Sequence, residues 1–298
     1  MIAAATQPAR LPLPGGRRDA TVTVTPMLTG EVSVPPGFLD RSQAPFGGLL
    51  RAALTPRSRW QRVPIPAFLV EHPAAGPILI DTGLHPVMAS DPKANIGSLG
   101  TRLSPTRMDE EQAVVRRLGE RDILPSEIGL IVMTHLHWDH ASAIGEFPHS
   151  TFLVDAHEWQ AATHGGMRHG YHRPHFDHPF AWRLLDFDGP LVESFSAFGR
   201  TIDLFGDESV RLCSTPGHSP GHLSVLLRLA EGELLIAADA AYTRQTIDRD
   251  LIPLVVHDEH SYLRSLGELR RYAEATPQAT IIAGHDPVQW PKLEDVYR

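Results

Sequence analysis

The stretch VMTHLHWDHASAIGEF, residues 132–147, places three imidazoles and a carboxylate within six positions. These are His135, His137, Asp139 and His140. Such groups repel one another when protonated and lose hydration when buried, so their crowding needs a compensating partner. His135 and His137, two apart on an extended segment, point the same way, whereas Asp139 and His140 follow a turn. Because imidazoles and carboxylates suit Zn, Mn, Fe or Co, the spacing predicts a metal centre.

The surrounding sequence predicts that this cluster lies at the end of a strand. The apolar run IGLIVMT, residues 128–134, is typical of a buried strand, and layered α/β proteins commonly carry their sites in the loops that follow strands. Residues 63–83 predict a hairpin that ends at Asp81. For Asp81 we expect hydrogen-bonded support of a ligand histidine, with simple loop capping as the alternative.

Further ligand types follow later strand-like segments. His218 lies in STPGHSPGH, Asp239 in IAADAAY and His285 in IIAGHD. This recurrence at strand ends, rather than the total of 17 histidines, argues against chance. His222 begins the next strand and is predicted to be structural.

Composition limits the classes of partner. The chain has 298 residues and a formal net charge of -8, with a pI near 6.1, which argues against nucleic acid or anionic membrane as partners. No apolar stretch approaches the ~20 residues of a membrane span. The single cysteine, Cys213, excludes an intrachain disulfide and fits a reducing compartment. We therefore expect a soluble, cytoplasmic protein.

The remaining segments carry weaker predictions. Residues 1–20 are expected to be a flexible N-terminal tail, followed by a single domain over residues 21–298. The irregular segment 29–59 is a candidate lid or contact surface, and residues 106–121 predict a helix. The five histidines between residues 164 and 178 match neither a helix face nor a strand, so a flap is favoured over a dedicated metal site.

A second helix is predicted at DAHEWQAAT, residues 155–163. Its Asp155 and Glu158 match a capping box, in which the two side chains satisfy the first backbone N–H groups of the helix.

The HxHxDH motif at residues 135–140 resembles that of the metallo-β-lactamase superfamily, and the later segments match in order from residue 21 to residue 286. The resemblance implies an α/β fold, a four-layer αβ/βα sandwich. It also implies two divalent metal ions, zinc first, with Fe, Co or Mn as alternatives. In that pattern one ion is bound by His135, His137 and His218, and the other by Asp139, His140 and His285. Asp239 and a water or hydroxide bridge them.

Two segments narrow the resemblance. TPGHSPGH and DAAYT look like those of the quorum-quenching N-acyl homoserine lactone lactonases, which carry a tyrosine three residues after the bridging aspartate, here Tyr242. This implies opening of the lactone ring of an acyl-bearing substrate by a metal-bridging hydroxide. Tyr242 would donate a hydrogen bond to the carbonyl oxygen, and Asp139 would carry a proton to the leaving group. Packing on the core is the alternative for Tyr242, and a homodimer is implied.

Other functions remain open at this point. The same centre could hydrolyse phosphotriesters or other carboxylic esters, and a metal-bound ligand sensor without turnover is the non-enzymatic alternative. The acyl-chain length and the native metals are left open.

Overall fold

The first of two mixed sheets has eight strands and contains most of the N-terminal half of the chain. The computed structural model describes residues 4–44, 48 and 55–298. The strand order is β1-β8-β7-β6-β4-β3-β2-β5. The strands are β1 (Thr6–Pro8), β2 (Thr23–Val34), β3 (Gln61–His72), β4 (Gly76–Ile80), β5 (Thr106–Arg107), β6 (Leu130–Val132), β7 (Thr151–Asp155) and β8 (Ala181–Leu185).

The second sheet has six strands in the order β14-β13-β12-β11-β10-β9. They are β9 (Glu193–Phe195), β10 (Phe198–Asp203), β11 (Val210–Ser214), β12 (Leu223–Leu229), β13 (Gly232–Ala238) and β14 (Thr280–Ala283). Phe68 and Ile80 of the first sheet share one buried apolar cluster with Leu212 and Val225 of the second. The two sheets therefore pack face to face around a common core.

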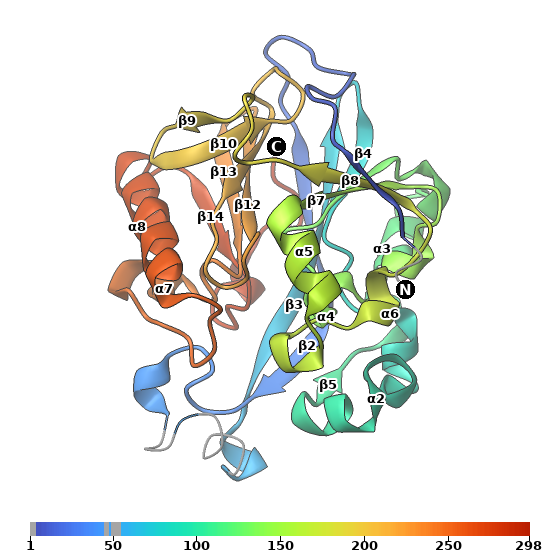
Figure 1. Ribbon diagram of the computed structural model, residues 1–298, viewed down its shortest axis with the longest axis vertical. Helices are drawn as coiled ribbons and strands as arrows, with labels where there is room; N and C mark the ends of the chain where they lie inside the picture. Colours follow the sequence, from blue (N-terminus) through green and yellow to red (C-terminus); the bar gives the residue numbers. More distant parts are fainter. Residues whose placement is uncertain (1–3, 45–47, 49–54) are drawn as a thin grey trace.

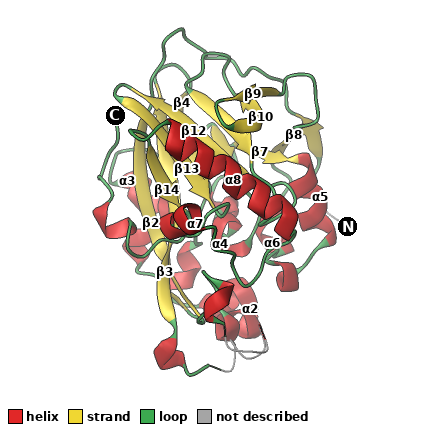
Figure 2. Ribbon diagram, turned by 90° about the vertical axis from the view of Figure 1, so that its left-hand side faces the viewer, coloured by secondary structure: helices red, strands yellow, loops and turns green. Residues whose placement is uncertain are grey.

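Helices cover the outer faces of both sheets (Figures 1 and 2). Leu118 and Trp159 pack on the outer side of the first sheet, and Tyr262 and Leu266 pack on the second. This layering confirms the predicted αβ/βα sandwich. The helices are α2 (Pro92–Leu103), α3 (Val114–Gly119), α4 (Trp138–Ala141), α5 (Ala156–His164), α6 (Arg173–Phe176), α7 (Arg244–Arg249) and α8 (Glu259–Ala275).

The strand directions bring the predicted site residues to one edge. Strands β4, β6, β7 and β8 run parallel, as do β13 and β14, so their carboxyl ends lie together. Asp81 follows β4, the histidine cluster follows β6, and Asp239 and His285 follow β13 and β14. Because these strands are largely buried and hydrogen-bonded to neighbouring strands, the loops that follow them are held in place.

The N-terminal segment differs from the prediction. Strand β1 pairs in parallel with β8, and the backbone N–H of Ala9 donates to Leu184 O at 2.8 Å. Leu11 and Leu13 pack against the core between the sheets. The predicted flexible tail is therefore wrong for residues 4–20, because this segment covers an edge strand that would otherwise expose its N–H and C=O groups. Residues 1–3 lie outside the described residues.

Two other predicted segments are also revised. Residues 29–34 are regular, because β2 continues to Val34 against β3. Within the candidate lid, residues 45–47 and 49–54 lie outside the described residues. The helix predicted over residues 106–121 is restricted to α3, because Thr106 pairs with Val32 of β2 and Ala113 is extended. In the described part of the chain, no helix combines the length and apolar character needed to cross a bilayer.

Candidate metal centre

The structure brings all seven predicted ligand residues together. His135 and His137 lie in the loop after β6, and Asp139 and His140 lie in the first turn of α4. The other three come from the second sheet, where each of them follows a strand: His218, Asp239 and His285. All seven are buried except His137, which is half-buried. The site therefore joins one continuous loop of the first sheet to three separate loops of the second.

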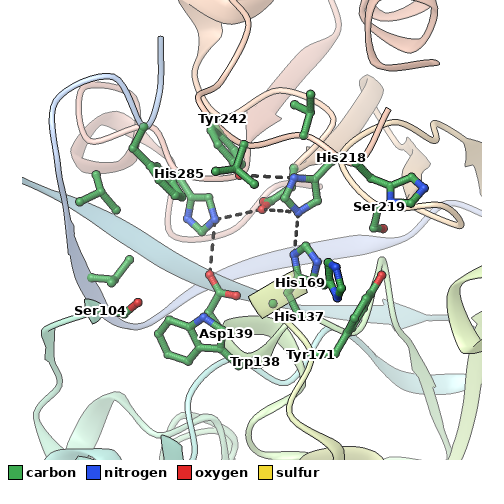
Figure 3. Close-up of a pocket in the computed structure, with 18 of the residues that line it drawn as sticks. Ser104, His137, Trp138, Asp139, His169, Tyr171, His218, Ser219, Tyr242 and His285 are labelled. Atoms are coloured by element: carbon green, nitrogen blue, oxygen red, sulfur yellow. Dashed lines mark hydrogen bonds and ion pairs between the residues drawn. The ribbon is translucent and has the colours of Figure 1, made fainter. Parts of the chain in front are cut away.

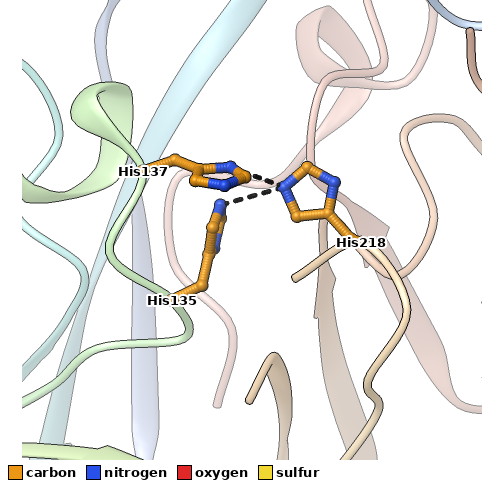
Figure 4. Close-up of side chains that lie close together, drawn as sticks. All are labelled: His135, His137 and His218. Carbon is orange, nitrogen blue, oxygen red and sulfur yellow. Dashed lines mark hydrogen bonds between the residues drawn. The ribbon is translucent and has the colours of Figure 1, made fainter. Parts of the chain in front are cut away.

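Three imidazoles form the first group of candidate ligands (Figure 4). His218 Nε2 lies 3.2 Å from His135 Nε2 and 2.8 Å from His137 Nδ1. These nitrogens come from both sheets, and the three candidate ligand atoms all lie within 4.8 Å of one another. The group has the size of a metal coordination shell.

Asp139, His140 and His285 form the second group, with candidate ligand atoms again within 4.8 Å. The Asp239 carboxylate lies between the groups. Its Oδ2 is 3.3 Å from His218 Nε2 and 3.2 Å from His285 Nε2, and its Oδ1 is 3.4 Å from His140 Nε2. Asp239 is therefore placed to contact ions in both groups.

Asp81 orients two of the histidines. His140 Nδ1 donates to Asp81 Oδ2 at 2.8 Å, so the predicted hydrogen bond between Asp81 and a candidate ligand histidine is present. The Thr134 hydroxyl donates to the same carboxylate at 2.7 Å, so its oxygen accepts from His135 Nδ1 at 3.1 Å. Because both Nδ1 atoms carry the proton, both Nε2 atoms direct a lone pair toward the centre.

A backbone carbonyl fixes His285 in the same way. Its Nδ1 donates to Pro64 O at 2.7 Å, and its bare Nε2 faces Asp239 and Asp139. The Nε2 atoms of His140 and His285 and the carboxylates of Asp139 and Asp239 thus converge on one point. His140 Nε2 and Asp239 Oδ1 have no hydrogen-bond partner among the described residues. Buried acceptors of this kind are stabilised by cations, so the residues present fit a divalent metal centre.

The electrostatics favour positive charge at this point. Burial lowers the pKa of His137 to about 4 and the pKa values of His135 and His218 well below their ordinary value. For His140 and His285, burial alone would lower the pKa, but the nearby Asp239 raises it above the ordinary value. The Asp239 carboxylate therefore attracts a cation into the space between the imidazoles.

Tyr242 lies beside the first group (Figure 3). Its Oη is 3.3 Å from His218 Nδ1, and its ring stacks on Phe38 with centroids 5.2 Å apart. With its Nε2 turned inward, His218 donates through Nδ1 to the phenol oxygen, which leaves the phenol proton free to donate into the cavity. Burial and the charge of Asp239 raise the pKa of Tyr242 well above its ordinary value, so the phenol stays protonated.

His222 supports the centre from outside. The backbone N–H of Asp239 donates to His222 Nε2 at 3.0 Å, and His222 Nδ1 lies 2.9 Å from Thr215 Oγ1. Its Nε2 lone pair is therefore already used, and burial lowers its pKa to about 3. The predicted structural role of His222 is confirmed.

A cavity of about 250 Å³ opens above the centre. Its floor includes Asp139, Tyr242 and His285. Its walls carry apolar side chains from three distant segments of the chain: Val32, Val34, Phe38, Trp138, Val255 and Val256. The sequence provided no signal for these wall residues, because they converge only in the folded chain.

Sequence reasoning also missed the position of Glu158. Asp155 Oδ1 caps α5 by accepting from the N–H groups of His157 and Glu158, at 2.6 and 3.2 Å. The Glu158 side chain does not complete the capping box. It turns inward and accepts hydrogen bonds from the loops that carry the metal-centre histidines.

The sequence model of the metallo-beta-lactamase superfamily matches residues 60–285 of the chain. The chain belongs to this superfamily. The N-acyl homoserine lactonase AttM of Azorhizobium caulinodans is 35% identical over 239 residues, which cover 78% of this chain and 85% of AttM. The predicted relation to the lactonase branch of the metallo-beta-lactamase superfamily is therefore confirmed.

Solved structures agree on the fold. A Bacillus thuringiensis AiiA variant with N-decanoyl-L-homoserine at its active site has a TM-score of 0.75 and 23% identity, over 92% of this chain and 97% of that chain. AidC, a dizinc quorum-quenching lactonase in complex with a product, has a TM-score of 0.60 and 14% identity, over 93% and 90%. These structural similarities establish the metallo-beta-lactamase fold for this chain.

Proposed function

We propose that this protein is a dinuclear metal-dependent lactonase that opens the lactone ring of N-acyl homoserine lactones. One observation carries the proposal: seven candidate metal ligands lie together, and five of them line an apolar-walled cavity beside the Tyr242 phenol. The 35% identity to a curated N-acyl homoserine lactonase supports the same substrate class.

In this proposal, His135, His137 and His218 hold one ion, and Asp139, His140 and His285 hold the other. Asp239 contacts both. Zinc suits this set of imidazoles and carboxylates, and AidC is described as a dizinc enzyme. When bound, the ions would supply an acidified water as the nucleophile and polarise the carbonyl. Asp81, Thr134 and Pro64 would keep the lone pairs of their histidines directed inward.

Two residues act on the reacting atoms in this proposal. Tyr242 donates a hydrogen bond to the carbonyl oxygen as negative charge develops there, because its own proton is free and its oxygen is held by His218. Asp139 lines the cavity and carries a proton to the ring oxygen that leaves. The stacking of Tyr242 on Phe38 holds the phenol in place.

In this proposal the cavity walls bind the acyl chain of the substrate. Val32, Val34, Val255 and Val256 present apolar surface directly above the centre, which favours a neutral alkyl tail. The acidic net charge of -8 gives no general attraction for a polyanionic substrate.

The test is a pH-stat assay of the zinc-loaded protein with N-hexanoyl and N-decanoyl homoserine lactones, since ring opening releases a proton. A phosphotriester and a simple carboxylic ester are assayed in parallel. Faster turnover of the acyl lactones supports the proposal. Faster turnover of the phosphotriester would replace it with the alternative hydrolase. Two bound ions with no turnover of any substrate would favour a ligand sensor.

We also propose a homodimer, which rests on the family resemblance and is tested by light scattering after size-exclusion chromatography. A cytoplasmic location remains a prediction, tested by fractionating the source cells.

A further inference from the structure

A carboxylate with no exposed surface lies between the two loops that supply the first group of histidines. Glu158, in the first turn of α5, accepts a hydrogen bond through Oε1 from the backbone N–H of Leu136 at 2.9 Å. Through Oε2 it accepts from the Ser219 hydroxyl at 2.6 Å and from the Gly221 N–H at 3.1 Å. One side chain therefore binds a loop of the first sheet and a loop of the second.

These contacts are adjacent to the candidate ligands in the sequence. Leu136 lies between His135 and His137, and Ser219 directly follows His218. The backbone at each of these points has little freedom to move without breaking a hydrogen bond to the same carboxylate. The distances among the three imidazoles, 2.8 and 3.2 Å, thus depend on a contact outside the centre.

Gly221 shows how closely α5 approaches the second loop. A Cβ atom at this position would lie 2.3 Å from Glu158 N and 2.7 Å from Glu158 Cβ. Such distances are far below van der Waals contact, so only glycine allows the helix end and the loop to meet here. The close approach is what allows a glutamate side chain to reach both loops.

The chemistry of Glu158 argues against a purely packing role. A buried carboxylate is costly unless it accepts several hydrogen bonds, and an apolar side chain could fill the same volume. Burial raises the pKa of Glu158, while its bonds from Ser219, Leu136 and Gly221 act to lower it. The three donors offset the cost of burial, and the carboxylate in turn satisfies donors of two loops.

We propose that Glu158 is a positioning residue that sets the separation between the His135–His137 pair and His218, and thereby the affinity for the ion held by these three histidines. It touches neither substrate nor reacting atoms. The inference rests on the proposed metal centre, but it concerns the affinity for one ion and not the reaction.

The experiment compares Glu158→Gln with the wild-type protein by chelator-competed zinc titration, together with the visible spectrum of the cobalt-loaded forms. Glutamine has nearly the same side-chain volume as glutamate, but only its Oε1 can accept a hydrogen bond, because the second terminal atom is an NH2 donor. Loss of a hydrogen-bonded support of metal ligands typically lowers metal affinity about 10- to 100-fold. We expect a loss of this size for one of the two ions, with the other unchanged, and an altered cobalt spectrum.

Asp207→Asn is the matched control. Asp207 is also a buried carboxylate that accepts several hydrogen bonds, from Arg17 N, Ser209 and His72. Its partner His72 is the last residue of β3, beside the hairpin turn that leads into β4. The Asp207–His72 contact therefore lies at the opposite end of β4 from Asp81 and the candidate metal centre. We expect this variant to lower Tm without changing either zinc affinity.

Wild-type zinc affinities in a folded Glu158→Gln protein would overturn the proposal, even if its Tm fell as in the control. Should that variant fail to fold, Ser219→Ala removes a single bond to Glu158 and is expected to weaken the same ion by a smaller factor. Unchanged affinity in Ser219→Ala would then overturn it. A wild-type protein that binds no zinc would instead overturn the metal centre itself, and this inference with it.

Discussion

Two regions of this molecule are rich in histidine, and only one of them is a candidate metal centre. The imidazoles of residues 135–140 belong, together with two carboxylates, to groups of candidate ligand atoms that lie within 4.8 Å of one another. In residues 164–178, the five histidines diverge. His164 and His169 are exposed, and the rings of His172 and His175 meet at 4.5 Å beside Asn95. No group of three metal-ligating side chains forms there among the described residues.

The comparison shows that the number of histidines does not create a metal site. In the first region, outer hydrogen bonds to Asp81 and Pro64 hold the protons away from the centre, so the lone pairs converge. In the second, the segment crosses α6 and turns, so that the rings of His172 and His175 contact each other while His164 and His169 are exposed. Convergence of lone pairs on one point is the physical distinction.

The largest effect is expected from Asp239→Asn. This change removes the negative charge between the two groups and leaves the imidazoles without a shared anionic partner. We expect lactone hydrolysis to fall by more than about 10³-fold, beyond the loss of a single oxyanion donor. Elemental analysis should show fewer than two ions per chain. Retention of two ions and of activity would show that the two groups bind metal independently of Asp239.

Tyr242→Phe should produce a smaller loss that leaves the metals in place. Removal of a donor to the developing oxyanion lowers kcat by about 10- to 1000-fold. Steady-state kinetics with zinc content measured on the same samples would separate this effect from loss of metal. An unchanged kcat/KM would assign Tyr242 to packing on Phe38.

His175→Gln tests the second region through stability. Burial lowers the pKa of His175 to about 3, with the positive charge of His172 acting in the same direction. In the unfolded chain His175 has a pKa near 6.5, so on acidification it is protonated there before it is protonated in the folded protein. The stabilisation that the neutral His175 gives the fold is therefore present above about pH 6.5 and is lost as the pH falls. At pH 5 the free energy of unfolding is about 2 kcal/mol lower than at pH 7 or above because of this residue.

Urea unfolding of both metal-free proteins at pH 7 and pH 5 measures this difference, because the other histidines titrate equally in each. The variant should lose about 2 kcal/mol less than the wild type on acidification. Equal losses in the two proteins would show that His175 is not held neutral by the fold.

The smallest effect is expected from His164→Ala. This exposed side chain contacts Gln160 O within its own helix at 2.8 Å. Surface substitutions of this kind change stability by within about 0.5 kcal/mol. Zinc content and lactone turnover should match the wild type. Loss of an ion would mean that the 164–178 region contributes a ligand after all.

Some elements were predictable because their signals are local. Strand β6 is an apolar run directly before the histidine motif, and α8 has apolar residues at helical spacing along its length. His218, Asp239 and His285 could be found because each follows such a strand. The segment 4–20 could not be placed in this way, since β1 pairs with β8 more than 170 residues away.

The sequence by itself determined the types of ligand, their positions at strand ends and the family, because the motif and the strand periodicities are properties of neighbouring residues. Only the tertiary structure decided which protons face outward, which apolar residues line the cavity, and that Glu158 binds both ligand loops. Leu136, Glu158 and Ser219 are far apart in the chain. Their contact depends on the close approach of α5 to Gly221, which arises from packing between the two sheets.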